Sequence, residues 1–399
     1  MIFEARTIAG RFDPPSISSA AGESGVIPFN KPHLTGREMA YIAEALGSGK
    51  LAGDGGFTRR CHATIEQLLG SGRSLLTTSC TDALEAAALL SKVGPGDEVI
   101  VPSFTFVSTA NAFALRGATI RFADSLPDHP NVDPAAVEAL ITPATKAIVP
   151  VHYAGVACDM DALGALAAAH DLIVIEDAAQ AIASSYKGRA LGTFGQFAAF
   201  SFHETKNVIS GEGGALHVND ERFFEAAEIV REKGTNRSAF FRGDVDKYGW
   251  VSLGSSYLPS EMIAAFLLAQ LEAIDSIQQK RLAIWAHYRQ RLSAIGESER
   301  VRLPMLPNFA TNNGHMFYLI CADLETRTGL IAHLRARGIM AAFHYQALHA
   351  SPYFAAMHGD RPLPNAARYS DTLVRLPFFA DLSPDEVDRV CDQIIEFFQ

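Results

Sequence analysis

Short apolar runs alternate with amphipathic stretches from about residue 75 of the chain onward. The runs cover residues 98–101, 118–122, 147–151, 172–175 and 197–200. Helical patterns lie between several of them, for example over 105–115 and 160–170. Because strands that are buried on both faces are almost continuously apolar, this alternation predicts an α/β fold with a mostly parallel sheet covered by helices.

The second half of the chain has a different pattern. Residues 260–295 contain few helix breakers and predict one long spine helix. A strand near 316–320, a helix near 330–337 and a final helix over 384–398, with Ser383 as its N-cap, predict a smaller α+β domain. Residues rich in Pro, Ser, Ala and Gly precede the large domain. We therefore expect a flexible N-terminal extension (1–26), a large domain (27–260), and a spine helix with a small C-terminal domain (261–399).

Composition and charge narrow the class of protein. The chain has 399 residues, of which 48% are hydrophobic and 20% charged, as in ordinary globular proteins. It contains no apolar run long enough to cross a bilayer, and its start does not resemble a signal peptide. Five scattered cysteines without a C-x-x-C pair indicate reduced thiols in the cytoplasm. The net charge of -10 argues against binding to nucleic acid.

Two residues at predicted strand ends suggest a cofactor. Lys206 follows the run at 197–200 and precedes a glycine-rich turn at 211–214, and Asp177 follows the run at 172–175. Ligands of parallel sheets bind at the carboxyl ends of strands. A lysine amine can form a Schiff base with pyridoxal phosphate (PLP), and a carboxylate can keep its pyridine nitrogen protonated. Taken singly, however, Lys206 reads as a surface lysine and Asp177 as a residue that caps a turn.

A hydroxyl-rich turn supplies the third part of such a site. Thr81 and Asp82 lie where residues 77–84 lead into an apolar helix, and free N–H groups at a helix N-terminus can hold a phosphate. Plain N-capping by Ser79 or Thr81 is the alternative. The order of phosphate turn, Asp177, Ser201 and Lys206 along the chain nevertheless predicts a PLP site. Phe106, at the start of a predicted helix, reads from the sequence alone as a core aromatic.

Several longer segments carry a family resemblance. The chain resembles the DegT/DnrJ/StrS-type nucleotide-sugar aminotransferases, which are fold type I PLP enzymes, over about residues 27–399. Within that family it is most similar to the enzymes that aminate C4 of TDP-4-keto-6-deoxyglucose. The matching segments are 50–60, 102–111, 149–158, 201–207 and 232–237.

The resemblance implies a role for each candidate residue. Lys206 would bind the cofactor and then move a proton, and Asp177 would pair with the pyridine nitrogen. Gln180 would lie near the ring hydroxyl, and Phe106 would cover the ring instead of entering the core. The phosphate would be held by Thr81, the backbone of Asp82 and Ser201. The fold type also implies at least a homodimer with shared active sites.

One segment departs from the family pattern. Many members have Gly-x-Asn-x-Arg-Met before the spine helix, and the asparagine reaches the PLP phosphate of the neighbouring subunit. In this chain Ser256 occupies the asparagine position and Leu258 the arginine position. Either Ser256 donates the hydrogen bond, or Asn236 in the preceding loop replaces it.

The resemblance also implies the substrates. L-Glutamate would donate the amino group and a TDP-4-keto-6-deoxyhexose would accept it, giving TDP-4-amino-4,6-dideoxygalactose for surface polysaccharide such as lipopolysaccharide or enterobacterial common antigen. His344 and Tyr345 would lie at the mouth of the site, and no catalytic metal is expected. From the residues alone, the alternative for each diphosphate candidate is a solvated surface charge. These candidates are Lys31, Arg59, Arg60, Arg237 and Lys247.

Three alternatives compete with this function. A 3-keto-sugar aminotransferase would use the same motifs. A PLP sugar dehydratase would have histidine in place of Lys206, so the lysine argues against it. A PLP-bound regulator or inactive partner subunit would not need the complete set of Asp177, Gln180, Ser201 and Lys206.

Overall fold

A seven-stranded sheet forms the centre of the molecule. The computed structural model describes residues 25–296, 300–359 and 361–399. The strands in spatial order are β1 (Arg73–Thr77), β9 (Gly214–Val218), β8 (Phe197–Ser201), β5 (Ile173–Asp177), β4 (Thr145–Ile148), β2 (Glu98–Pro102) and β3 (Thr119–Ala123). In this order, the neighbours from β8 to β3 pair in parallel, whereas β9 runs antiparallel to both of its neighbours.

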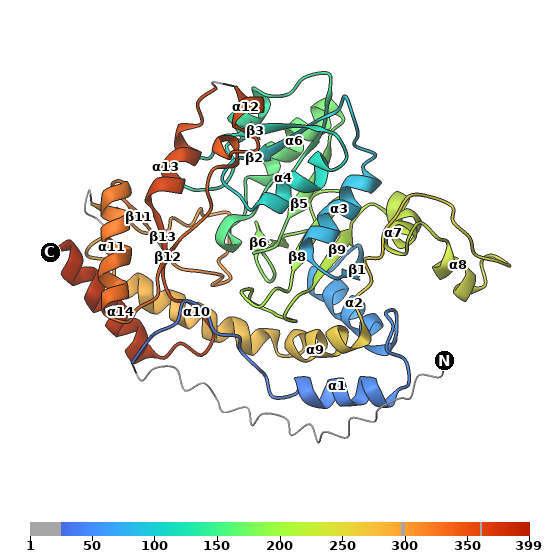
Figure 1. Ribbon diagram of the computed structural model, residues 1–399, viewed down its shortest axis with the longest axis horizontal. Coiled ribbons are helices and arrows are strands. Elements are labelled where there is room, and N and C mark those ends of the chain that lie inside the picture. The colour runs from blue at the N-terminus through green and yellow to red at the C-terminus, as the bar shows by residue number, and fades with distance from the viewer. Residues whose placement is uncertain (1–24, 297–299, 360) are drawn as a thin grey trace, which may run out of the picture.

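Helices cover both faces of this sheet (Figure 1). Val99 and Val101 of β2 enter one buried cluster, and Ile100 enters the cluster on the opposite face. This alternation follows from the two-residue repeat of a strand and explains why the runs are continuously apolar. The first face carries α3 (Cys80–Leu90), α4 (Val107–Ala114) and α7 (Phe224–Arg231); the second carries α2 (Gly56–Leu69), α5 (Pro134–Glu138), α6 (Met160–His170) and α9 (Glu261–Leu271), with α1 (Glu38–Gly47) packed against α9.

The predicted spine consists of two helices instead of one. Helix α9 ends at Leu271, and α10 (Ile274–Arg291) starts after Glu272 and Ala273. Figure 1 shows α10 continuing from the large sheet toward the C-terminal elements. The prediction of a helical spine is thus confirmed, but that of one unbroken helix is wrong, because a two-residue interruption without Gly or Pro leaves no signal in the sequence.

A second, smaller sheet lies beyond α10. Its order is β10-β11-β13-β12, and all of its pairs are antiparallel. Ser383 caps the last helix in a reciprocal capping box with Glu386, as its position before Pro384 predicts. Its elements are β10 (Val301–Arg302), β11 (Tyr318–Cys321), α11 (Leu324–Ala336), β12 (Ala342–Phe343), β13 (Leu373–Arg375) and α14 (Pro384–Phe398).

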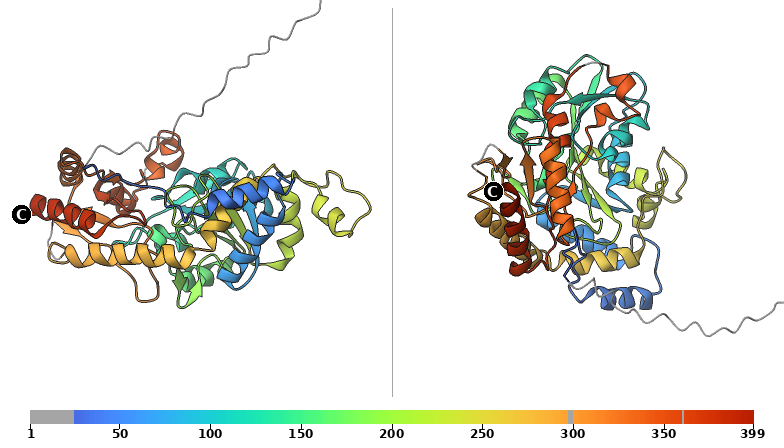
Figure 2. Two further views of the ribbon diagram at one scale, coloured as in Figure 1. Left: turned by 90° about the horizontal axis from the view of Figure 1, so that it is seen from below. Right: turned by 60° about the vertical axis from the view of Figure 1, so that its left-hand side comes forward.

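The remaining elements are short. Residues 235–252, which include α8, extend away from the body of the molecule in two views (Figures 1 and 2). The short elements are η1 (Tyr153–Gly155), β6 (Ser185–Tyr186), β7 (Arg189–Ala190), η2 (Glu221–Phe223), α8 (Arg237–Arg242), η3 (Leu348–Ala350), α12 (Ala355–His358) and α13 (Pro364–Thr372).

The start of the described chain is attached to the small sheet region. Ile27 forms a parallel bridge with Ile339 and belongs to the buried cluster around α11 and α14. Most of the predicted N-terminal extension, residues 1–24, lies outside the described residues. All five cysteines are unpaired. Among the described helices, none combines the length and apolarity that a membrane span requires.

Candidate active site

The turn before α3 offers free backbone donors. Ser79 caps α3, and its hydroxyl accepts a hydrogen bond from the Asp82 N–H at 3.1 Å. The N–H groups of Cys80 and Thr81 have no acceptor among the described residues. Gly214 of β9 lies so close that an added Cβ would be 2.4 Å from the Ser79 carbonyl carbon and 2.5 Å from the Cys80 nitrogen. This arrangement leaves two amides and a helix dipole for an anion.

Two buried carboxylates end β5 and face opposite ways. Glu176 accepts hydrogen bonds from the amides of Gly192, Phe194 and Gly195 at 2.6 to 2.8 Å, and its Oε2 lies 3.0 Å from His152 Nε2. Burial alone would raise the pKa of Glu176, but these hydrogen bonds outweigh it and lower the pKa. Glu176 therefore fastens the loop at residues 192–195 to the sheet.

Asp177 has fewer partners on the other face. Its Oδ2 accepts from the Thr109 hydroxyl at 2.7 Å, and its Oδ1 accepts from the Ala179 N–H at 3.1 Å. Burial raises the pKa of Asp177, and these two hydrogen bonds and the charge of Lys206 only partly oppose that rise. A cationic group beside Asp177 would stabilise the ionised carboxylate.

Lys206 lies in the loop between β8 and β9. Burial lowers the pKa of its amine; nearby Cys80 and Asp177 oppose that shift, and Arg375 adds to it. The next residue anchors the loop, because the Asn207 amide donates to Gln278 of α10 at 2.9 Å and its oxygen lies 2.8 Å from His315 Nδ1. Ser201, at the end of β8, is buried.

Gln180 connects β5 to a group of aromatic side chains. Its Nε2 donates to the Tyr345 hydroxyl at 2.9 Å, and its Oε1 accepts from the Ala154 N–H at 2.6 Å. The rings of His344 and Tyr345 stack with centroids 3.5 Å apart, and His344 Nδ1 lies 2.7 Å from the Tyr153 hydroxyl. Two predicted substrate residues, His344 and Tyr345, thus share a network with Gln180.

Phe106 is not a core residue. Its side chain is 55% exposed at the start of α4, and its ring centroid lies 6.3 Å from that of Tyr345. The reading of Phe106 as a core aromatic, made from the sequence alone, is therefore wrong. The pattern marks a helix start but does not show that the ring is exposed.

Four other predicted residues lie apart from this group and have different partners. Arg59 is exposed and donates to the Asp54 carbonyl at 2.9 Å, whereas Arg237 pairs with Glu232 at 3.1 Å. The Asn236 side chain accepts from the Gly249 N–H at 2.8 Å. Ser256 is exposed, and its backbone forms a bridge with Glu232.

This geometry fits PLP chemistry. The edge of the sheet brings together a partly buried amine of lowered pKa, a buried carboxylate that a cation would stabilise, and a helix N-terminus with free amides. A Schiff-base lysine, a pyridinium partner and a phosphate cradle are the features that a PLP enzyme requires. No group of three or more His, Cys, Asp or Glu side chains in the described part of the chain could hold a metal ion.

Comparison with known proteins identifies the family. Residues 32–395 match the DegT/DnrJ/EryC1/StrS aminotransferase family, and the chain belongs to it. The spore coat polysaccharide biosynthesis protein SpsC of Bacillus subtilis is 33% identical over 377 residues, which cover 92% of this chain and 96% of SpsC.

Solved structures agree with the family. Sugar aminotransferase CalS13 from Micromonospora echinospora is 26% identical with a TM-score of 0.84, and the match covers 93% of this chain and 99% of CalS13. Spr1654 from Streptococcus pneumoniae, in its PLP form, is 26% identical with a TM-score of 0.85, and the match covers 93% and 98% of the two chains. The protein is thus a PLP-dependent sugar aminotransferase with the predicted α/β fold.

Some residues of the site were missed in the sequence. Thr109, Asn207 and His315 position Asp177 and the Lys206 loop, and Arg375 of β13 influences the pKa of Lys206. Thr109 and Asn207 lie in segments that resemble the family, so the resemblance could have identified them as candidate site residues. Arg375 is distant in sequence and enters the site only through the packing of the small sheet.

Proposed function

We propose that the enzyme transfers the amino group of L-glutamate to C4 of a TDP-4-keto-6-deoxyhexose, giving TDP-4-amino-4,6-dideoxygalactose for surface polysaccharide. The observation that carries the proposal is the grouping of Lys206, Asp177 and Gln180 at one edge of the sheet. The local resemblance of segments such as 50–60 and 149–158 supports C4. The name of SpsC, a spore coat polysaccharide biosynthesis protein, supports a polysaccharide product.

Lys206 is the proposed proton carrier. When bound, PLP withdraws electrons from the carbon that reacts and carries the amino group from donor to acceptor. The amine of Lys206 has a lowered pKa because of burial, so more of it is neutral near neutral pH and able to accept a proton. Its loop is held by Asn207, which keeps the amine in place through both halves of the reaction.

Asp177 is proposed to hold the pyridine nitrogen in its protonated form. Thr109 and the Ala179 N–H fix the direction of the carboxylate. A cationic ring nitrogen would offset the burial that raises the pKa of Asp177, so the carboxylate and the ring stabilise each other's charged forms. Gln180 would hold the ring hydroxyl, and Phe106 would cover the ring.

The phosphate is proposed to bind at the start of α3. Thr81, whose hydroxyl lies 2.8 Å from that of Ser108, provides a free N–H and a side-chain donor, and Ser201 provides a second hydroxyl. The backbone of Asp82 was predicted to take part. Because its N–H already donates to Ser79, the neighbouring Cys80 N–H is better placed to help Thr81.

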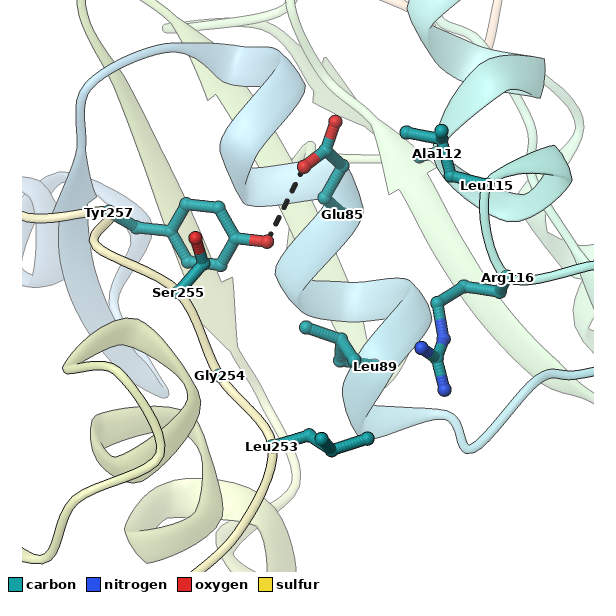
Figure 3. Close-up of a pocket in the computed structure, with 9 residues that line it drawn as sticks. All are labelled: Glu85, Leu89, Ala112, Leu115, Arg116, Leu253, Gly254, Ser255 and Tyr257. Carbon is teal, nitrogen blue, oxygen red and sulfur yellow. Dashed lines mark hydrogen bonds between the residues drawn. The ribbon is translucent and has the colours of Figure 1, made fainter. Parts of the chain in front are cut away.

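A second copy of the chain is proposed to complete the site. Leu115, Trp250 and Leu253 are exposed by 58 to 80%, an arrangement that favours an interface. Leu115 and Leu253 line a groove of about 280 Å³ between α3, α4 and residues 253–257, and Figure 3 shows the side chains around it. Ser256 lies between Ser255 and Tyr257, which line this groove. We propose that a neighbouring copy packs there and that its own Ser256 or Asn236 completes the phosphate site.

The substrate assignments and the location in the cell complete the proposal. His344 and Tyr345 would contact the sugar, because they share the network of Gln180. Arg59 and Arg237 would reach the diphosphate, and both have side chains accessible enough to do so. Five unpaired thiols favour the cytoplasm.

One assay tests the reaction. The purified enzyme is incubated with L-glutamate and TDP-4-keto-6-deoxyglucose, and the sugar product is examined by NMR. We expect an axial amine at C4, as in the galacto configuration. An amine at C3 from the corresponding 3-keto sugar, with no product from the 4-keto sugar, would establish the 3-keto-sugar aminotransferase instead. Loss of the yellow absorbance on adding glutamate alone tests the donor separately.

A further inference from the structure

Two buried threonines at the start of α4 are joined through their hydroxyl groups. Thr105 Oγ1 lies 2.9 Å from Thr109 Oγ1, and Thr109 Oγ1 lies 2.7 Å from Asp177 Oδ2. Thr105 and Thr109 are 2% and 0% exposed. Burying a hydroxyl group is costly unless it is hydrogen-bonded, and valine would fill nearly the same volume without that cost. The two hydroxyls therefore need an explanation other than packing.

Helix capping does not explain them. The N-cap residue of α4 is Phe106, whose side chain makes no capping hydrogen bond. Thr105 precedes the N-cap, and within the described residues its hydroxyl has Thr109 as its only hydrogen-bond partner. The Thr109 hydroxyl in turn has only Thr105 and Asp177 as partners there. The pair thus forms a chain that leads from the turn before α4 to the carboxylate at the end of β5.

The number of protons fixes the direction of this chain. A threonine hydroxyl has one proton to donate, and an ionised carboxylate can only accept. The proton of Thr109 therefore goes to Asp177, and the contact of 2.9 Å is a hydrogen bond that Thr105 donates to Thr109. A helical threonine can otherwise turn its proton to the carbonyl oxygen four residues earlier. The hydrogen bond from Thr105 orients the Thr109 hydroxyl and strengthens the bond that it donates.

Asp177 depends on this bond more than Glu176 depends on any one donor. Glu176 accepts from three amides and lies beside His152, whereas Asp177 accepts from Thr109 and the Ala179 N–H. Burial raises the pKa of Asp177, and the Thr109 hydroxyl has the largest effect among the groups that oppose this rise. A change in the strength of the Thr109 bond therefore changes how readily Asp177 ionises.

Other titratable groups face Asp177 from separate parts of the fold. They are Lys206 in the loop between β8 and β9, His152 after β4, Cys80 at the start of α3, and Tyr345. All four stay in place in the variants described below. A change that follows the removal of one threonine hydroxyl therefore reports on the hydroxyl chain.

We propose that Thr105 is a positioning residue, which acts through Thr109 to orient the Asp177 carboxylate and to stabilise its ionised form. The ionised carboxylate is the form that pairs with a protonated ring nitrogen. Because Thr105 directly precedes Phe106, one turn supplies both the hydroxyl that orients Asp177 and the ring that is proposed to cover the cofactor. The inference rests on the proposed role of Asp177 and adds a residue that supports it.

The test compares each threonine variant with a counterpart that also carries Asp177→Asn. Thr105→Val and Thr109→Val each remove one hydroxyl at nearly constant volume, whereas Thr105→Ser keeps it. Thr372→Val is the matched control, because the buried Thr372 hydroxyl donates to a carbonyl oxygen of α13 at 2.8 Å and not to a carboxylate. Urea unfolding of the cofactor-free proteins from acid to neutral pH measures stability. The difference within each pair isolates the titration of Asp177.

A group with a raised pKa contributes stability at low pH that is lost as pH rises through its folded value. We expect the midpoint of this loss to move upward by about one pH unit in Thr109→Val and by about half a unit in Thr105→Val. Thr105→Ser should resemble wild type, and Thr372→Val should lose stability equally at every pH. With PLP bound, turnover of Thr105→Val should fall by about 3-fold, the ratio that half a unit represents, with half-saturation by both substrates unchanged.

An unchanged midpoint in the folded Thr105→Val protein would overturn the inference. An equal shift in Thr105→Ser would also overturn it, as would a pH-dependent effect of Thr105→Val that persists when residue 177 is asparagine. If Thr105→Val does not fold, Thr105→Ala compared with Thr105→Ser decides in the same way. The proposed function fails separately, because a reaction that gives no amino sugar contradicts the transfer while the cofactor-free pH profile still decides the role of Thr105.

Discussion

At the carboxyl end of β5, two adjacent carboxylates on opposite faces of the sheet have different roles. On one face Glu176 is saturated by three amides and the imidazole of His152, so it closes a loop onto the sheet. On the other face Asp177 has one hydroxyl and one amide and looks toward Lys206. Adjacent residues in a strand point to opposite faces, so one strand end supplies both a structural and a chemical carboxylate. Both residues are acidic, so the residue type does not distinguish their roles. The number of hydrogen-bond donors around each carboxylate does.

The largest effect is expected on the chemical face. Lys206→Ala should lower turnover by about 1,000-fold or more, because the proton carrier is removed. The free energy of unfolding should change little, since the loop is anchored by Asn207. Steady-state rates and thermal unfolding check both parts. Lys187→Ala, which removes an exposed lysine that pairs with Asp161, is the control and should keep full activity. Normal turnover by Lys206→Ala would contradict the assignment.

On the face that carries Glu176, a substitution should mainly change stability instead of turnover. Glu176→Ala leaves three amides and His152 without their acceptor and should lower the free energy of unfolding by about 3 to 5 kcal/mol. Urea unfolding of the cofactor-free protein measures the change. Asp161→Ala, which removes an exposed carboxylate, should leave the free energy of unfolding almost unchanged. A Glu176→Ala protein as stable as wild type would remove the distinction between the two faces.

One side of this contrast was predicted from the sequence. The strand ends, Asp177 and Lys206 followed from apolar runs and from the rule that ligands bind at the carboxyl ends of parallel strands. The sequence did not show that Glu176 captures residues 192–195, because those donors are backbone amides, which every residue except proline possesses.

Contacts between the two sheets were harder to predict. Arg375 reaches the site only because β13 pairs with β11 and that sheet packs beside Tyr153. The hydrogen bond from Gln180 to Tyr345 likewise depends on the packing of elements that are distant in sequence. Periodicity reports which face of an element is buried but not which distant element covers it, and such contacts depend on how whole elements dock.

The dependence of stability on pH should also distinguish Glu176 from Asp177. Glu176 has a lowered pKa, so its stabilising effect is present above the unfolded pKa of about 4.5 and is lost as pH falls through the folded value. Asp177 has a raised pKa, so it destabilises the cofactor-free protein above that value, and the penalty disappears as pH falls. Asp177→Asn should therefore raise cofactor-free stability near neutral pH, on the order of 1 kcal/mol, with no gain at low pH.

Activity provides the second readout of Asp177→Asn. Turnover should fall by about 100-fold, because the neutral amide no longer favours the protonated ring nitrogen. Urea unfolding at several pH values and steady-state rates measure the two effects. Glu176→Gln, which keeps the shape of the side chain, should show the reverse pH profile, with its loss of stability largest near neutral pH. Equal profiles for the two variants would contradict the contrast between the faces.

The smallest effect concerns the unresolved donor to the phosphate. Asn236 and Ser256 also differ in their hydrogen-bond partners. The Asn236 side chain already accepts from the Gly249 N–H, whereas Ser256 is exposed. Ser256→Ala should weaken cofactor binding about 10-fold, which corresponds to the loss of one hydrogen bond to a charged group at the weak end of the usual range. Asn236→Ala should instead loosen residues 236–249 and change PLP affinity less. Titration of the cofactor-free variants with PLP, followed by absorbance, measures both. A larger loss in Asn236→Ala, with Ser256→Ala unchanged, would assign the phosphate contact to the asparagine and show that a side chain can serve its own loop and the neighbouring site at once.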